Sequence, residues 1–219
     1  MKLVIQIVLW IVIVFLGWKL YDSIMGPVEF NKTKEIRYAK VIKNLKDIQA
    51  AELAHKEITG SFTGSFDSLV NFIETAKFAI TQRRDTSYAD VAKNKAFGIS
   101  EGYYLDKSLI DTLGFTSVKD SLFGNSDRYK TMMNVPIEGV NAKFDLKAGK
   151  ITRNDATYSV FEAKVPKDVV LHGLNKDLLM QEKQVQSVDG VNGPYIKVGS
   201  MEEVNTSGNW PKIYDTVTN

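Results

Sequence analysis

The chain has 219 residues with 28 basic and 26 acidic side chains, which leaves a formal net charge of only +2. Such a balance gives no overall field that would recruit nucleic acid, so no nucleic-acid partner is expected. The 44% of hydrophobic residues are enough for a substantial core. The absence of cysteine excludes a disulfide framework and a catalytic thiolate.

An apolar run from Leu3 to Tyr21 contains twelve Leu, Ile, Val or Phe among its first fourteen residues. As a helix this run is about 28 Å long, close to the roughly 30 Å hydrocarbon core of a bilayer. Its apolar side chains favour insertion by roughly 4 to 7 kcal/mol, and the single polar residue Gln6 does not reverse that sign. Residues 1–25 are therefore predicted to be a transmembrane anchor. The candidate anchor residues are Leu3, Trp10, Phe15, Trp18, Lys19 and Tyr21.

A cleaved signal peptide is the main alternative to an anchor. Cleavage requires a small-x-small site, whereas the apolar run ends in Gly17, Trp18, Lys19, Leu20 and Tyr21. Aromatic rings and a lysine at this position are typical of a membrane interface instead. The pattern favours an uncleaved anchor.

The basic residues around the run bear on which side of the membrane the rest of the chain lies. Lys2 alone precedes the run, and Lys19, Lys32, Lys34, Arg37 and Lys40 follow it, so the positive-inside rule would keep the following domain in the cytoplasm. Only Lys19 is adjacent to the run, however, and long domains are exported largely regardless of charge. We expect a bacterial inner-membrane protein with its C-terminal domain in the periplasm.

Beyond the anchor, Gly26–Pro27 is expected to break the helix, and Asn31 or Thr33 to cap a second helix that ends near Ile58. Apolar residues recur in this second helix at steps of three and four, opposite a basic, solvated face. Its stripe must be buried by the chain's own sheet or by a partner protein. The candidate partner-facing residues are Ile36, Val41, Ile42, Leu45 and Ile48.

Gly60 is expected to end the second helix, and Ser65 to cap a third that runs from Phe66 to about Ile80. Two helices joined by a short turn form an antiparallel hairpin. The polar stretch around Arg83, Arg84 and Asp85 is interpreted as a loop. Residues 26–113 are thus predicted to be a helical region.

From residue 114 onward the pattern changes to short strands separated by turns. Tight turns are expected at residues 147–150 and 154–155, Pro166 is expected to end a strand, and Asn175 to cap a helix from Lys176 to about Gln186. Helices followed by strands indicate an α+β fold, with a mainly antiparallel β region, 114–219, packed on the helical region as one periplasmic unit. The expected strands are 116–122, 129–135, 142–146, 150–153, 158–165, 169–172 and 195–198.

Few residues point to chemistry. His55 and His172 are the only histidines and lie far apart in the chain, so no metal site is predicted. No G-x-S-x-G element supports a serine nucleophile, and the glycine-rich turn 60–65 lacks the lysine of a phosphate-binding loop. We expect no catalytic residues, no cofactor and no enzymatic activity.

Several runs of the chain resemble an uncharacterised family of single-pass envelope proteins from Bacteroidota. The resemblance implies a location rather than an activity, and it associates the chain with inner-membrane machinery that energises outer-membrane transport, of the ExbB and ExbD type. The runs that carry it are residues 27–32, 42–51, 60–72, 120–124, 160–166, 198–203 and 208–210.

The order of an apolar helix, an amphipathic helix, a Gly-aromatic turn and a sheet also resembles type IV pilins and pseudopilins. Their processing site and the glutamate early in the mature helix are missing, since Met1-Lys2-Leu3 opens the sequence and Gln6 is its sixth residue. The expected break at Gly26–Pro27 would also interrupt a pilin helix. A pilin-like assembly subunit remains an alternative.

Two classes of function follow from these patterns. One is a structural or coupling subunit of a multi-protein envelope complex, whose partners are the bilayer and other inner-membrane or periplasmic proteins. The other is a membrane-tethered periplasmic domain that binds a ligand or acts as an enzyme. The missing catalytic constellation favours the first.

Overall fold

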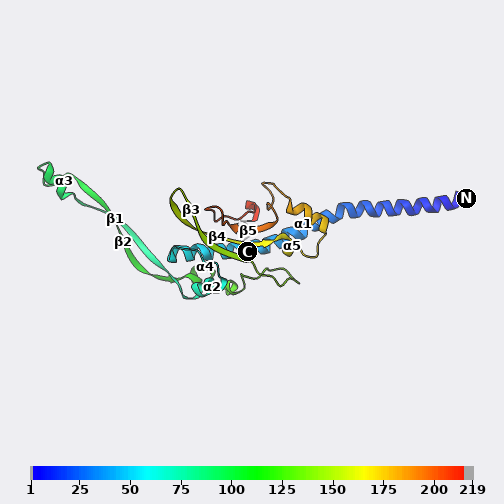
Figure 1. Ribbon diagram of the computed structural model, residues 1–219, viewed down its shortest axis with the longest axis horizontal. Helices are drawn as coiled ribbons and strands as arrows, with labels where there is room; N and C mark the ends of the chain where they lie inside the picture. Colours follow the sequence, from blue (N-terminus) through cyan, green and yellow to red (C-terminus); the bar gives the residue numbers. More distant parts are fainter. Residues whose placement is uncertain (1, 215–219) are drawn as a thin grey trace. The chain divides into compact units, whose positions relative to one another are not determined.

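The computed structural model describes residues 2–214 (Figure 1), so residue 1 and residues 215–219, which end the expected β region, lie outside the described part. The fold is mixed helix and strand with two antiparallel sheets, which confirms the α+β class. The chain divides into two compact units. One contains the chain up to Val70 and from Asp127 onward, and the other is Asn71–Ser126. These bounds differ from the expected regions 26–113 and 114–219.

Helix α1 (Lys2–Thr59) is continuous and carries Pro27 in its interior, so the expected break at Gly26–Pro27 is wrong. A proline inside a helix removes one hydrogen bond and crowds the preceding turn, at a cost of about 3 kcal/mol. Long helical segments on both sides outweigh that local cost, because extending an existing helix is far easier than starting a new one. Gly60 ends α1 in the left-handed conformation, as expected, and its N–H donates to the Lys56 carbonyl at 2.8 Å.

The second half of α1 packs against a three-stranded sheet of order β3-β4-β5, formed by β3 (Asp145–Arg153), β4 (Ala156–Pro166) and β5 (Tyr195–Gly199). Four consecutive residues of the central strand, 160–163, are buried, so both faces of β4 are covered. The α1 side of this core is formed by Tyr38, Val41, Ile42, Leu45, Ile48, Ala51 and Ala54.

The turn in this sheet lies later than one of the two expected positions. β3 runs straight through residues 147–150, and the chain reverses at Asn154 and Asp155, whose φ angles are +51° and +61°. Two successive left-handed residues are the requirement of a type I′ hairpin, and Asn and Asp adopt that conformation more easily than most residues. The turn at 154–155 is therefore confirmed, and the turn at 147–150 is wrong.

At Gly199 the fold accepts only glycine. Its φ is +75°, and a Cβ atom there would lie 2.2 Å from the carbonyl oxygen of Phe161 on the neighbouring strand. The close approach of β5 to β4 therefore depends on the absence of a side chain.

Three expected strands are short helices instead. Residues 116–122 contain the end of β2 and helix α4 (Val118–Phe123), residues 129–135 begin in the 3₁₀ helix η1 (Arg128–Lys130), and residues 169–172 overlap α5 (Lys167–Val170). Local capping decides two of these cases. The Ser117 hydroxyl caps α4, and Pro166 ends β4 as expected and fixes the φ from which α5 starts.

Helix α6 (Lys176–Lys183) confirms the expected helix after Asn175, whose side chain accepts hydrogen bonds from the N–H groups of Asp177 and Leu178. The described chain ends in the 3₁₀ helix η2 (Lys212–Tyr214).

The second unit is dominated by a long two-stranded ribbon (Figure 1). Helix α2 (Phe66–Thr75) has the expected start, with the Ser65 hydroxyl accepting from the Ser68 N–H at 3.4 Å, but it ends five residues before Ile80. Strand β1 (Lys77–Ala89) follows, and helix α3 (Val91–Ala96) connects it to β2 (Tyr104–Ser117). The expected loop at 83–85 therefore lies inside a strand, within the region predicted to be helical.

Candidate functional site

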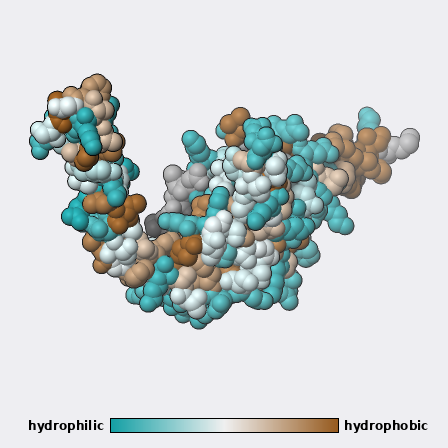
Figure 2. All heavy atoms as spheres, turned by 60° about the vertical axis from the view of Figure 1, so that its left-hand side comes forward, coloured by the Kyte–Doolittle hydropathy of each residue, from teal (hydrophilic) through white to brown (hydrophobic). Residues whose placement is uncertain are grey.

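The first half of α1 is apolar and exposed on every side. The large hydrophobic side chains between Leu3 and Ile24 expose 43 to 68% of their surface. This segment appears brown in Figure 2. An apolar surface all round a helix suits lipid rather than a protein core. The segment is a candidate membrane span by length and composition. The six predicted anchor residues, Leu3, Trp10, Phe15, Trp18, Lys19 and Tyr21, are all exposed on it.

Four of the five predicted partner-facing residues are buried. Val41, Ile42, Leu45 and Ile48 are at most 1% exposed, because the protein's own sheet supplies a matching apolar face. These four side chains belong to the core and cannot contact a partner in this structure. Ile36 alone stays exposed, at 52%.

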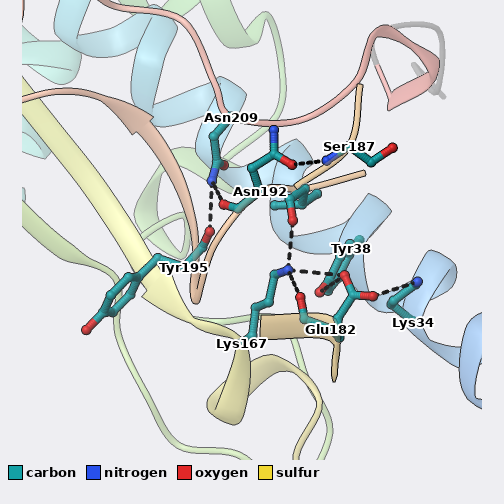
Figure 3. Close-up of polar contacts among 9 residues, drawn as sticks. Lys34, Tyr38, Lys167, Glu182, Ser187, Asn192, Tyr195 and Asn209 are labelled. Atoms are coloured by element: carbon teal, nitrogen blue, oxygen red, sulfur yellow. Dashed lines mark hydrogen bonds and ion pairs between the residues drawn. The ribbon is translucent and has the colours of Figure 1, made fainter. Parts of the chain in front are cut away.

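A buried ionic cluster joins α1, α5 and α6 (Figure 3). The Lys167 ammonium is fully buried and donates to the Val191 carbonyl at 2.7 Å, the Glu182 carbonyl at 2.6 Å and the Glu182 carboxylate at 3.1 Å. The same carboxylate accepts from the Tyr38 hydroxyl at 3.1 Å and pairs with Lys34 at 2.9 Å. Three N–H donors meet three acceptors, so the ammonium is fully satisfied.

The electrostatics of this cluster follow from burial. Burial lowers the pKa of Lys167, and the neighbouring Glu182 carboxylate opposes that change. Burial and the same carboxylate raise the pKa of the Tyr38 hydroxyl. The cluster fixes two helices and a loop to α1, which is a structural role.

Two asparagines hold the loop that follows α6 (Figure 3). The Asn192 side chain accepts from the Ser187 N–H at 2.8 Å. The Asn209 amide donates to the carbonyl oxygens of Asn192 at 3.0 Å and Tyr195 at 2.8 Å. These side chains replace regular backbone pairing in a segment that lacks it.

A surface cleft of about 710 Å³ lies over the outer part of the sheet. Glu162 occupies its middle and binds Lys164 at 2.6 Å and Lys197 at 3.3 Å. Burial alone would raise the pKa of Glu162, but the two lysines outweigh it and hold that pKa below its ordinary value. Lys147 on the same rim pairs with Asp145 at 3.4 Å. Each lysine of the cleft thus has a carboxylate partner, and Lys164 and Lys197 share Glu162.

The C-terminal part of α1 contains a further buried acid, Glu52. One of its carboxylate oxygens accepts from the Thr63 N–H at 2.9 Å, and the other has no hydrogen-bond partner among the described residues. Burial raises its pKa to about 7. His55, one turn later, bonds the Ser61 carbonyl at 2.6 Å and so helps to close the helix end. No group of His, Asp or Glu residues in the described chain could hold a metal ion.

Sequence reasoning did not identify Lys167, Glu182 or Glu52, because isolated charged residues in a sequence give no sign that they are buried. Helical spacing grouped Glu52 with the lysines on the solvated face of its helix, and this assignment is wrong, because Glu52 is fully buried. Protein-family models, curated proteins and solved structures were compared with the chain, and none matches it. The function of this protein is therefore inferred from its exposed apolar helix and from its internally satisfied polar groups.

Proposed function

We propose that this protein is a non-enzymatic, membrane-anchored structural or coupling subunit of a multi-protein assembly in the bacterial envelope, with its folded part in the periplasm. One observation carries the proposal. The apolar segment and the central core helix are the same uninterrupted helix, α1.

Continuity of α1 has a mechanical consequence. A domain that merely needs to stay near a membrane is joined to its anchor by a flexible linker, which decouples the two. Here the chain from Tyr21 to Phe30 is helical, so a rotation or displacement of the anchor is transmitted to the core. This supports a structural or coupling role over a freely tethered ligand-binding domain.

The partner class to test first is the proton-driven motor of the ExbB and ExbD type, because such assemblies are built around transmembrane helices that transmit motion. The surfaces available to such partners are the lipid-exposed half of α1 and its extension near Ile36, which is 52% exposed. Within lipid, the association energy would come from small residues that let two helices pack closely and from polar side chains that hydrogen-bond between helices.

The continuity of α1 also favours the second candidate, a pilin-like assembly subunit. A helix that is exposed and apolar in its first half and packed on an antiparallel sheet in its second half has the plan expected of a pilin. Under this alternative the exposed halves of many copies would pack together into a filament. Electron microscopy of sheared cell-surface material, with and without the gene, distinguishes a filament subunit from a membrane-embedded one.

A linker insertion tests the main proposal. Six Gly and Ser residues inserted after Gly26 would decouple the anchor from the core, and the matched control is the same insertion at exposed Gly139. Proteins that co-purify in mild detergent are identified by mass spectrometry for each variant. We expect the Gly26 insertion to keep the protein in the membrane but lose its partners, whereas the Gly139 insertion keeps both. Equal partner recovery from both insertions would favour a freely tethered module.

A second experiment tests on which side of the membrane the folded part lies. Because the chain contains no cysteine, an introduced cysteine is its single thiol. Ser207→Cys places a single thiol on the exposed surface of the folded unit. In cells with a permeabilised outer membrane, a membrane-impermeant maleimide should label this thiol before lysis. Labelling only after lysis would place the folded part in the cytoplasm and contradict the proposed location.

A further inference from the structure

The ribbon formed by β1 and β2 is unusual in its exposure. The strands are 13 and 14 residues long and pair only with each other, so both outer edges present unpaired backbone groups. Nearly every side chain in the ribbon is exposed or half-exposed. An isolated two-stranded ribbon is marginally stable at best in water, and three or more strands with a hydrophobic face, or packing against a helix, are needed for independent stability. A further strand would therefore stabilise this ribbon.

The register of the ribbon shows which side chains share a face. Directly opposed residues lie on the same side of an antiparallel pair, and side chains alternate along each strand. Tyr88 opposes Leu105 and Arg84 opposes Leu109, which places these four on one face. The exposed apolar residues of this face, between 38 and 51% exposed, are Ile80, Tyr88, Leu105 and Leu109.

Along β2, this face has a pattern that is complementary to itself. Its residues, up to a β-bulge at Leu113, are Leu105, Lys107, Leu109 and Asp111. When two copies of β2 run antiparallel with Leu109 opposite Leu109, Lys107 of each copy opposes Asp111 of the other. We propose that β2 pairs in this way with β2 of a second copy of the chain, forming a four-stranded sheet with a two-fold axis at Leu109.

The charged groups of β2 are available for this pairing. Lys107 is exposed and forms no ion pair within the described chain. Asp111 pairs with Arg84 of its own ribbon, but both contacts of that guanidinium use Oδ2. The second carboxylate oxygen, Oδ1, remains to accept from Lys107 of the other copy. Opposite charges placed directly across a sheet stabilise the pairing.

The outer edge of β1 lacks this property. An antiparallel self-pairing of β1 about Arg83, about Arg84 or between them would place two guanidinium groups directly opposite each other. Like charges directly opposite are destabilising, and charge on an edge strand is a common protection against pairing. The ribbon thus has one edge, β2, whose central register pairs opposite charges, and one edge, β1, whose registers centred on Arg83 or Arg84 oppose like charges. The resulting four-stranded sheet is closed, because a two-fold interface is satisfied by two copies.

This inference rests on the proposed function only in treating the chain as a subunit of an assembly, and it names one contact of that assembly. The anchor and the linker experiment do not depend on it. If β2 does not pair, the anchor and the result of the linker experiment are unaffected. If the anchor proposal fails, the register of the ribbon is unaffected.

Disulfide trapping tests the contact in the full-length protein in mild detergent. In the proposed dimer the two Leu109 Cα atoms are about 5 Å apart, within the range of a disulfide. The matched control is Thr86→Cys, on β1 and the same face, whose copies would be separated by three strand spacings, roughly 14 Å across the sheet, and by a further offset of four residues along the strands. We expect mild oxidation to convert Leu109→Cys into a covalent dimer and to leave Thr86→Cys monomeric. Equal yields at both positions, or no dimer at Leu109→Cys, would overturn the proposal.

A charge exchange tests the register in the same Leu109→Cys background. Lys107→Asp and Asp111→Lys each place like charges opposite one another twice, so each alone should lower the rate of dimer trapping by about tenfold. A mixture of the two variants, carrying different tags, restores both ion pairs, and the mixed dimer should form at the parent rate. Equal rates of dimer trapping in the parent and in both charge variants would refute the register. If Asp111→Lys does not fold, Lys107→Asp alone still decides, because a parent-like rate would refute the register.

Discussion

The buried Glu52 carboxyl gives the sharpest quantitative prediction for this protein. It lies on the core side of α1, fully buried, with a single hydrogen bond from the Thr63 N–H. One oxygen has no partner among the described residues, and desolvation raises the pKa from an ordinary 4.5 to about 7. Since the folded state holds this proton more tightly than the unfolded chain, folding stability depends on pH.

The sign follows from linkage. Between pH 4.5 and 7 the folded protein binds more protons at Glu52 than the unfolded chain does, so the free energy of unfolding falls as pH rises. The contribution is complete below pH 4.5 and is lost as pH rises through about 7. At about 1.4 kcal/mol per pH unit, the loss between pH 4.5 and 7 is roughly 3 to 3.5 kcal/mol. For a folded region of this size that corresponds to roughly 6 to 12 °C in melting temperature.

Glu52→Gln isolates this contribution, because the amide resembles the protonated acid and does not titrate. Thermal unfolding of the full-length protein in mild detergent, followed by near-UV circular dichroism, should give similar melting temperatures for the variant and the parent at pH 5. At pH 8 the variant should melt roughly 6 to 12 °C higher. Glu57→Gln, at an exposed position of the same helix, is the control and should shift melting equally at both pH values. A parent-to-variant difference for Glu52→Gln that stays constant from pH 5 to pH 8 would refute the reasoning.

Three further predictions use the same melting assay. Leu45→Ala should cost about 2 to 5 kcal/mol, because its side chain is fully buried; an unchanged melting temperature would mean that this stripe is not packed. Lys167→Met should cost about 3 to 5 kcal/mol by breaking the buried cluster, whereas Lys183→Met, at the mostly exposed pair with Asp168, should cost under about 1. Gly199→Ala should cost clearly more than Gly173→Ala, since both have positive φ but only Gly199 faces a carbonyl at 2.2 Å; equal losses would contradict the close approach.

The parts of the fold that could be predicted from sequence are those in which one face of an element meets the core. The stripe of Val41, Leu45 and Ile48 repeats at helical spacing because one side of α1 is buried, and β4 is apolar because it is the central strand. Caps at Asn175 and Ser65 were equally readable, since their side chains bond the first turn of a helix directly.

The ribbon could not be predicted in the same way. Period-two alternation appears in a sequence when a sheet buries one face, and neither face of β1 is buried within the chain. Arg83, Arg84 and Asp85 therefore read as a loop, although they lie in the middle of a strand. The buried cluster escaped detection for a related reason, because the partners of Lys167 come from segments 15 and 24 residues away, and Glu182 is bonded in turn by Tyr38 of α1.

Burial of Leu45 and its neighbours within the protein changes where association energy must come from. A stripe covered by the chain's own sheet contributes to folding and is not available for binding. Two large apolar surfaces remain exposed, the first half of α1 and the ribbon, and exposed apolar surface on this scale is rare in monomers.

Lipid suits the first, because the helix is apolar all round and free of charge along its middle. It does not suit the second, where Lys107, Asp111 and Arg84 are interleaved with the leucines and both strand edges carry unpaired backbone groups. Only another strand satisfies apolar side chains, paired charges and backbone together, which is why the ribbon and not the helix stripe is where a protein partner is expected.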